Sequence, residues 1–206
     1  MKKKVFSDVF TYIFPVLCMS VILFCCKADT REIEIKDSKG KVVEKYQVDP
    51  ATEKKQGLYQ RFYESGQLAE EAHYVRDTLD GARRFYFESG QLEREQHYLF
   101  GIFQGPFRSY YINGQLNAEG NYLNNEMDGV WKRYYDTGEL MEEVTFVNND
   151  ENGPFRELYK NGKVKAEGSY INGPYEHGEL KEYDEQGNLI RIMSCENGIC
   201  NTTWKK

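Results

Sequence analysis

Five glutamates recur at one place in a repeated segment, and they are the side chains best suited to acid–base chemistry. Their spacing is 24 residues, at Glu71, Glu95, Glu119, Glu143 and Glu167. Two strands advance about 10 Å across a sheet, so glutamates of neighbouring hairpins lie too far apart to act as a pair. Basic residues are expected to face this column across the strand pair, at Arg84, Arg108, Lys132, Arg156 and Lys181. A nearby cation lowers a carboxyl pKa, so the pattern predicts a structural row of ion pairs.

The histidines and the polar loops give no better candidate for chemistry. His73 and His97 occupy equivalent places two strands apart, too far for one metal ion, and His177 has no cysteine pair nearby. Residues 148–153 resemble the opening of a calcium loop, but Tyr159 stands where a bidentate glutamate is needed. Motifs of serine hydrolases, phosphate loops and zinc proteases are absent from the sequence. We expect no enzyme, no metal site and no cofactor.

Aromatic residues at the sixth place of each repeat are the remaining candidates for binding. With the opening glycine counted as the first residue, they are Phe62, Tyr86, Tyr110, Tyr134 and Tyr183, with Leu158 in the fifth copy. We expect them on the face opposite the main apolar one. Such a column could stack sugars or dock a protein, and it could equally serve cross-strand packing or self-association, because a single-layer sheet buries little.

The element that positions all these residues is a unit of about 24 residues, present six times. Its opening glycines are Gly57, Gly81, Gly105, Gly129, Gly153 and Gly178. A second glycine follows nine residues later in every copy, at Gly66, Gly90, Gly114, Gly138, Gly162 and Gly187. A fixed period of this size predicts a stacked array in which each unit contacts only its neighbours.

Each unit has the pattern of a β-hairpin followed by a polar return loop. Asn113-Gly114 between two apolar runs predicts a two-residue type I′ turn, in which both central residues have positive φ. That turn pairs the fourth residue of the unit with the glutamate at the fifteenth. It also gathers the third, seventh, twelfth and eighteenth residues on one apolar face, whereas a three-residue bulged turn would shift the register by one.

The sequence therefore predicts an all-β fold, an elongated single-layer antiparallel sheet of about six stacked hairpins. We expect residues 27–56 to form a linker and a capping hairpin, residues 57–194 the repeat array, and residues 195–206 a C-terminal cap. Asp37 and Asp184 replace the seventh-place aromatic at the two ends, where a stack must stop presenting apolar surface.

This pattern resembles the MORN-repeat family, and most closely its bacterial variant branch. The resemblance rests on Tyr110-Tyr111, Tyr134-Tyr135, Asn113-Gly114, and the closing Asp80-Gly81 and Asp128-Gly129. It covers about residues 57–194, and differs from the usual unit by a glutamate in the second strand and a period one residue longer. It implies an open solenoid of hairpins with an interaction role. Bacterial members of this branch are often labelled antitoxin-like.

The first 26 residues have the features of an export signal. Lys2-Lys3-Lys4 precedes an almost unbroken apolar stretch from Val9 to Cys26. Leu23-Phe24-Cys25-Cys26 resembles a loose lipobox, with Cys26 as the lipidation site. An uncleaved membrane anchor is the alternative. Either reading places the repeats outside the cytoplasm, anchored to the membrane, and Lys27 favours the outer membrane or periplasmic face.

The remaining cysteines and the charge agree with an exported binding protein. Cys195 and Cys200 flank Asn197-Gly198 in a short hairpin, which predicts a disulfide in an oxidising compartment. The net charge is −6, and loss of the signal removes three lysines and one aspartate, which argues against nucleic-acid binding. We expect a cell-envelope lipoprotein that binds an unknown protein. The alternatives are an intracellular antitoxin-like inhibitor and an envelope glycan-binding module.

Overall fold

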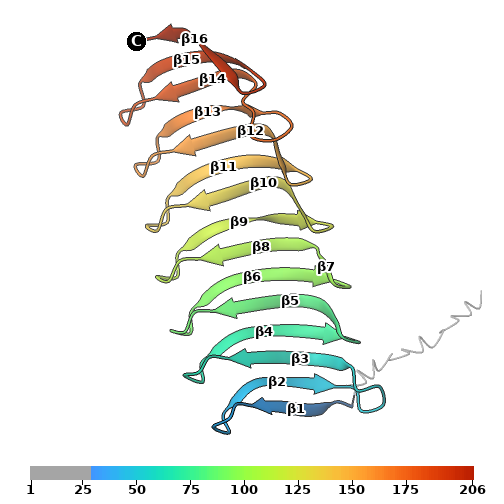
Figure 1. The fold of residues 1–206 in the computed structure, drawn as a ribbon. Coiled ribbons are helices and arrows are strands. Elements are labelled where there is room, and N and C mark those ends of the chain that lie inside the picture. The colour runs from blue at the N-terminus through green and yellow to red at the C-terminus, as the bar shows by residue number, and fades with distance from the viewer. Residues whose placement is uncertain (1–28) are drawn as a thin grey trace, which may run out of the picture.

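The computed structural model describes residues 29–206, which form one open, twisted antiparallel sheet (Figure 1). The strands follow one another in chain order from β1 to β16, with the short β7 beside β6 as the one departure from this path. Every connection in the described range joins neighbouring strands, so the contacts are local throughout. The predicted all-β, single-layer array of hairpins is confirmed.

The strands are short and similar in length. The N-terminal hairpin is β1 (Arg31–Lys36) and β2 (Val42–Val48). The repeats are formed by β3 (Lys55–Phe62), β4 (Leu68–Val75), β5 (Thr78–Tyr86), β6 (Leu92–Leu99), β7 (Ile102–Phe103), β8 (Gly105–Tyr110), β9 (Leu116–Leu123), β10 (Glu126–Tyr134), β11 (Leu140–Val147), β12 (Asp150–Leu158), β13 (Val164–Tyr170), β14 (Gly178–Tyr183) and β15 (Leu189–Glu196). The last strand is β16 (Ile199–Lys205).

The hairpin turns differ from the predicted two-residue type I′ turn. In the third repeat the Gly114 amide donates to the Tyr111 carbonyl at 2.8 Å, and the Tyr111 amide donates to the Gln115 carbonyl at 2.8 Å. Gly114 has φ +84°, whereas Asn113 is not among the residues with positive φ. This is a three-residue turn that ends in a bulged, left-handed glycine. The predicted turn type was wrong.

The predicted register is nevertheless correct, because a second bulge compensates for the first. Tyr110 pairs with Leu116, but Ser109 pairs with Ala118, so Asn117 is an extra residue on its strand. The shift of one residue caused by the turn is thereby reversed. Arg108 consequently faces Glu119, as predicted. The same pairing joins Arg84 to Glu95, Lys132 to Glu143 and Arg156 to Glu167.

The connections between repeats are tight turns for the most part, not the polar loops predicted from the sequence. We call them return turns. Residues 76–77, 100–101, 124–125, 148–149 and 197–198 each link paired strands, and both residues of every pair have positive φ. These are the type I′ turns that were expected at the opposite edge. The segment 171–177 alone is longer, because no strand begins before Gly178.

Each return turn is hydrogen-bonded to the main chain 22 residues earlier. The amide of its second residue donates to a main-chain carbonyl at 2.8–3.0 Å in all six copies. The donors are Asp77, Gly101, Asn125, Asn149, Gly173 and Gly198. Where that residue is Asp77, Asn125 or Asn149, its side-chain oxygen also accepts the amide of the same earlier residue. These paired bonds fix how one repeat stacks on the next.

The opposite edge is tied by tyrosine hydroxyls at the seventh place of the repeat. Tyr63, Tyr111, Tyr135 and Tyr159 each donate to a main-chain carbonyl in the following repeat, at 2.6–2.9 Å. The acceptors are the carbonyls of Tyr86, Tyr134, Leu158 and Tyr183. Phe87 occupies the equivalent place in the second repeat and has no hydroxyl to donate.

Most buried residues lie on one face of the sheet, as predicted for the third-place and eighteenth-place residues. The twelfth-place residues differ from the prediction, because each pairs with the sixth-place residue, as Leu116 does with Tyr110, and not with the seventh. Third-place and eighteenth-place aromatics contact one another, for example Tyr59 with Tyr74 and Phe155 with Tyr170. The best-packed cluster is Val144, Phe155, Leu180, Met193 and Cys195, near the C-terminal end. The Phe155 ring also covers Gly168, where an added Cβ would meet it at 3.0 Å. No second layer of described residues covers this face, so many of its side chains stay half-exposed.

The tyrosine bonds predict opposite effects for two substitutions. Tyr135→Phe removes the hydrogen bond from the Tyr135 hydroxyl to the Leu158 carbonyl. It should lower the free energy of unfolding by about 1 kcal/mol. Phe87→Tyr should supply the bond missing from the second repeat and raise it by a similar amount. Urea unfolding followed by circular dichroism measures both. Equal stabilities of the two variants would contradict this role for the hydroxyls.

Candidate binding surface

The face opposite the buried one carries the row of charged residues. The fourth-place cations Arg84, Arg108, Lys132 and Arg156 lie between two glutamates, one in their own hairpin and one in the preceding hairpin, whereas Lys181 pairs with Ile192 in its own hairpin. Arg84 reaches Glu95 at 2.8 Å and Glu71 at 3.7 Å, and Arg108 lies 3.6 Å from Glu119. Arg156 pairs with Glu143 of the preceding hairpin at 3.4 Å, not with Glu167 as predicted. Because these acids and bases form ion pairs with one another, the row has the geometry of a structural ion-pair network.

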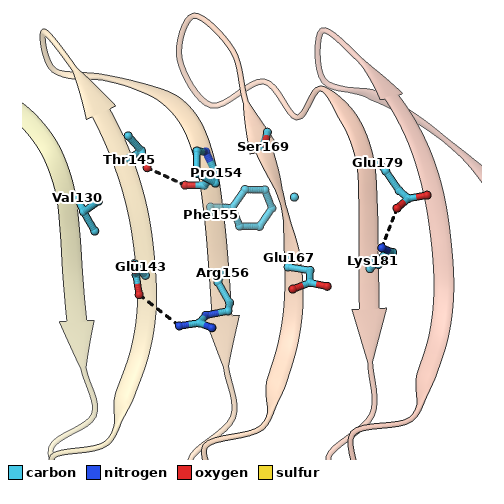
Figure 2. Close-up of a pocket in the computed structure, with 11 residues that line it drawn as sticks. Val130, Glu143, Thr145, Pro154, Phe155, Arg156, Glu167, Ser169, Glu179 and Lys181 are labelled. Atoms are coloured by element: carbon cyan, nitrogen blue, oxygen red, sulfur yellow. Dashed lines mark hydrogen bonds and ion pairs between the residues drawn. The ribbon is translucent and has the colours of Figure 1, made fainter.

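The largest groove on this face lies over β10–β14 and has a volume of about 480 Å³. Figure 2 shows its charged lining: Arg156 with Glu143, Lys181 with Glu179 at 2.8 Å, and Glu167 between the two pairs. Glu167 accepts a hydrogen bond from the Tyr183 hydroxyl at 2.7 Å. The charged groups of the groove are therefore already paired within the protein, and a charged ligand would have to displace these contacts.

The predicted aromatic column of Phe62, Tyr86, Tyr110, Tyr134 and Tyr183 is half-buried throughout. Two of its hydroxyls bind the glutamate row: Tyr134 donates to Glu119 at 2.8 Å, and Tyr183 donates to Glu167. Burial, followed by the hydrogen bond to Glu119, raises the Tyr134 pKa to about 12. These contacts support the packing role of the column over the role of a free stacking surface.

A buried charge cluster on the apolar face is the feature that the sequence reasoning missed. Glu70 is only 4% exposed and lies between Arg83, at 2.7 Å, and Arg61, at 3.1 Å. The guanidinium groups of Arg83 and Arg94 lie 4.8 and 4.3 Å from the centre of the Phe85 ring. The signal was present in Arg83, which occupies a place held by an aromatic or leucine in the other repeats.

Beside this cluster, the Lys55 ammonium lies among three tyrosine rings. Its distances to the ring centres of Tyr46, Tyr59 and Tyr74 are 4.7, 4.5 and 5.3 Å. Glu44 lies 3.5 Å from the same ammonium. Burial, with smaller contributions from Glu44 and Glu70, raises the Tyr59 pKa to about 12. The arrangement joins the N-terminal hairpin to the first repeats through cation–π contacts.

The other predicted residues occupy structural positions. The ring Nδ1 of His73 and of His97 lies 3.1 Å from a carbonyl oxygen, that of Asp80 and Pro106 respectively. Asn149 belongs to a return turn, and its side-chain oxygen accepts the Met127 amide at 2.7 Å. Within residues 29–206 no group of three or more His, Cys, Asp or Glu side chains is placed to hold a metal ion.

The two C-terminal cysteines face each other across β15 and β16. Cys195 and Cys200 are disulfide-bonded, with their Cα atoms 4.0 Å apart. Cys195 belongs to the buried cluster, so the bridge joins the last hairpin to the core. The predicted export signal over residues 1–26 and the predicted lipidation site Cys26 lie outside the described residues. Over the described part of the chain, no helix has the length and apolar character needed to cross a membrane.

The comparisons with known proteins identify the repeat. A family model described as "MORN repeat variant" matches residues 55–76, 79–99, 103–124, 127–148, 151–172 and 176–197. These six matches cover more than half of the chain, which therefore belongs to the MORN repeat variant family. They coincide with the strand pairs from β3 to β15. No curated protein matches the chain significantly.

One solved structure with local similarity is a mutant of S. aureus TarM in complex with Fondaparinux, alpha-GlcNAc-glycerol and UDP. The sequence identity is 14%, and the match covers 59% of this chain and 21% of the TarM chain. This chain thus spans about a fifth of the length of that protein. The TM-score of 0.28 is too low to indicate a shared overall fold.

The charge cluster gives a stability prediction with a matched control. Glu70→Gln leaves Arg61 and Arg83 without their shared counter-charge and should lower the free energy of unfolding by about 2 kcal/mol. Glu71→Gln, one residue further on, removes a half-exposed partner of Arg84 and should cost less than about 1 kcal/mol. Chemical denaturation compares the two variants. A loss at Glu71 as large as that at Glu70 would contradict the buried cluster.

The raised pKa of Tyr59 predicts a loss of stability in alkali. A tyrosine that stays protonated longer in the folded state than in the unfolded state stabilises the fold fully below the unfolded pKa. That contribution is lost as pH rises from about 10 to about 12. Tyr59→Phe keeps the ring contacts, so we expect similar stability at pH 8 and a shallower decline above pH 10. If the urea midpoints of the two proteins fell equally as the pH rose above 10, the loss of stability would not come from Tyr59.

Proposed function

We propose that this protein is a non-enzymatic cell-envelope lipoprotein whose repeat sheet binds another protein. The observation that carries the binding role is the architecture itself. A single open sheet of MORN repeats exposes both faces and both turn edges along its whole length (Figure 1). Arrays of this kind serve as extended binding surfaces. The charged groups of the largest groove are paired internally, which favours a protein partner over a charged small ligand.

Two features support the envelope location. The Cys195–Cys200 disulfide bond is of a kind that persists in oxidising compartments. The sequence before the sheet combines three lysines, an apolar stretch and Cys26, the elements of a lipoprotein signal. Cleavage before Cys26 would remove Cys18 and Cys25, and lipidation would use Cys26, so Cys195 and Cys200 would be the two remaining cysteines, both used in the bridge.

The intact mass of the native protein tests this proposal. The protein is extracted from membranes with detergent and without reductant. We expect a chain that begins at Cys26, heavier by acyl groups and lighter by two hydrogens for the disulfide. An unmodified, reduced chain that begins at Met1 and is found in the soluble fraction would refute the proposal and favour an intracellular antitoxin-like inhibitor.

A further inference from the structure

The return turn between β6 and β7 differs from its equivalents in its first residue. Phe100 has φ +51°, a left-handed conformation that is unusual for a bulky side chain. The equivalent residues are Arg76, Asn124, Asn148, Asn172 and Asn197. Asparagine adopts this conformation far more readily, so Phe100 bears a backbone cost that the turns beginning with asparagine largely avoid.

Burial inside the protein does not offset this cost. Phe100 is 72% exposed, the highest value among the exposed large apolar residues of the described chain. Leu99 and Ile102, which pair across the turn, are 49% and 41% exposed. The three side chains form an exposed apolar cluster at the tip of one turn. A strained, exposed aromatic is the kind of feature that proteins retain at binding sites.

The turn residues on either side of this tip are polar and carry no net charge, and the flanking Glu126 is half-buried. The next turn along the edge is Asn124-Asn125, and the preceding one is Arg76-Asp77, whose charges cancel. The chain as a whole has a net charge of −6, so the absence of net charge here is a local property. An apolar centre with a neutral, hydrogen-bonding rim has the composition of the central part of a protein–protein interface.

This tip matches a pocket better than it matches a flat surface. A lipid bilayer or a flat protein face pressed against this edge would also cover the neighbouring asparagine tips and remove their water. A concave pocket admits the apolar tip alone and leaves the asparagines at its rim. The matching partner surface is therefore an uncharged apolar pocket with hydrogen-bonding groups around it.

The chain path places the β1 end of this edge near the membrane if Cys26 is lipidated. Arg31 pairs with Val48, Val48 pairs with Lys55, and Lys55 bonds to the return turn at Asp77. β1 thus starts at the return-turn edge (Figure 1). Five residue steps separate Cys26 from Arg31, a reach of at most about 18 Å.

We propose that Leu99, Phe100 and Ile102 are the anchor by which this protein docks into an apolar pocket of its protein partner. The proposal rests on the protein-binding function proposed above and adds the site and the chemistry of the partner surface. On docking, the Phe100 ring is buried in the pocket. The asparagines of the adjoining turn then exchange their water for hydrogen bonds at its rim.

Photo-crosslinking of the full-length protein in its native cells tests the anchor. Benzoylphenylalanine replaces Phe100 in one strain and Ile112 in another. Ile112 is the matched control, because it is an exposed apolar residue in a hairpin turn at the opposite edge. We expect a discrete protein adduct at position 100 and none at position 112. An adduct at 100 with lipid or with a second copy of this chain would overturn the proposal.

The protein found in the adduct is then purified for affinity measurements. Phe100→Asn should raise the Kd about 30-fold or more, the usual effect of removing a central anchor. Its melting temperature should equal or exceed that of the wild type, because asparagine suits the turn. Ile112→Asn should leave the Kd unchanged. An unchanged Kd for Phe100→Asn would overturn the anchor.

The two proposals fail in distinguishable ways. Crosslinkers placed at positions 76, 124 and 148 sample the other return turns. Protein adducts at those positions but not at position 100 would refute the anchor and leave the binding function intact. The absence of any protein adduct from all these positions, with no partner on the wild-type chain, would refute both.

Discussion

The whole fold depends on main-chain hydrogen bonding between successive repeats. A single-layer sheet has no second layer to bury its apolar face, so the strand ladder and its two edges must hold the stack together. At one edge each return turn donates an amide to the main chain 22 residues earlier. At the other edge a tyrosine hydroxyl reaches the next repeat. The repeat length of about 24 residues brings both sets of partners into reach.

These edge contacts explain why the composition of the two edges differs. The return turns need positive φ at both residues, which asparagine, aspartate and glycine adopt readily, and in three of them an aspartate or asparagine at the second residue adds a side-chain acceptor. The hairpin turns use one left-handed glycine, and in four of the six repeats a tyrosine three residues before it donates to the next repeat. Phe87 departs from this pattern by losing a bond, and Phe100 departs by keeping a strained, exposed ring. The first departure affects stability, whereas the second is the basis of the proposed docking anchor.

The sequence predicted the architecture well, because the period, the glycines and the alternation of apolar residues all report on the same sheet. The register was right although the turn was wrong, since the extra residue at Asn117 cancels the bulge at Gly114. Two compensating bulges leave no trace in a pattern of apolar residues. Glu70 was missed because it lies next to Glu71, a member of the regular glutamate row. The two side chains point to opposite faces of the sheet, so Glu70 is buried and Glu71 is half-exposed.

The candidate binding residues were harder to predict from the sequence. The aromatic column was evident from its spacing, but spacing does not show that Tyr134 and Tyr183 bind glutamates of their own sheet. Phe100 lies where the pattern indicated a polar loop, and its exposure and left-handed backbone are properties of the folded turn. The prediction of an exported lipoprotein concerns residues before the sheet and is tested by the mass of the native chain.

Hydrogen exchange of the return-turn amides tests the central claim most directly. The account predicts that the amides of Asp77, Gly101, Asn125, Asn149 and Gly173 are protected as strongly as the neighbouring strand amides, because they bond across repeats. The first residues of the same turns serve as internal references. If the second-residue amides exchanged as fast as those of an open loop, the stack would not be held by these bonds, and the account would be wrong.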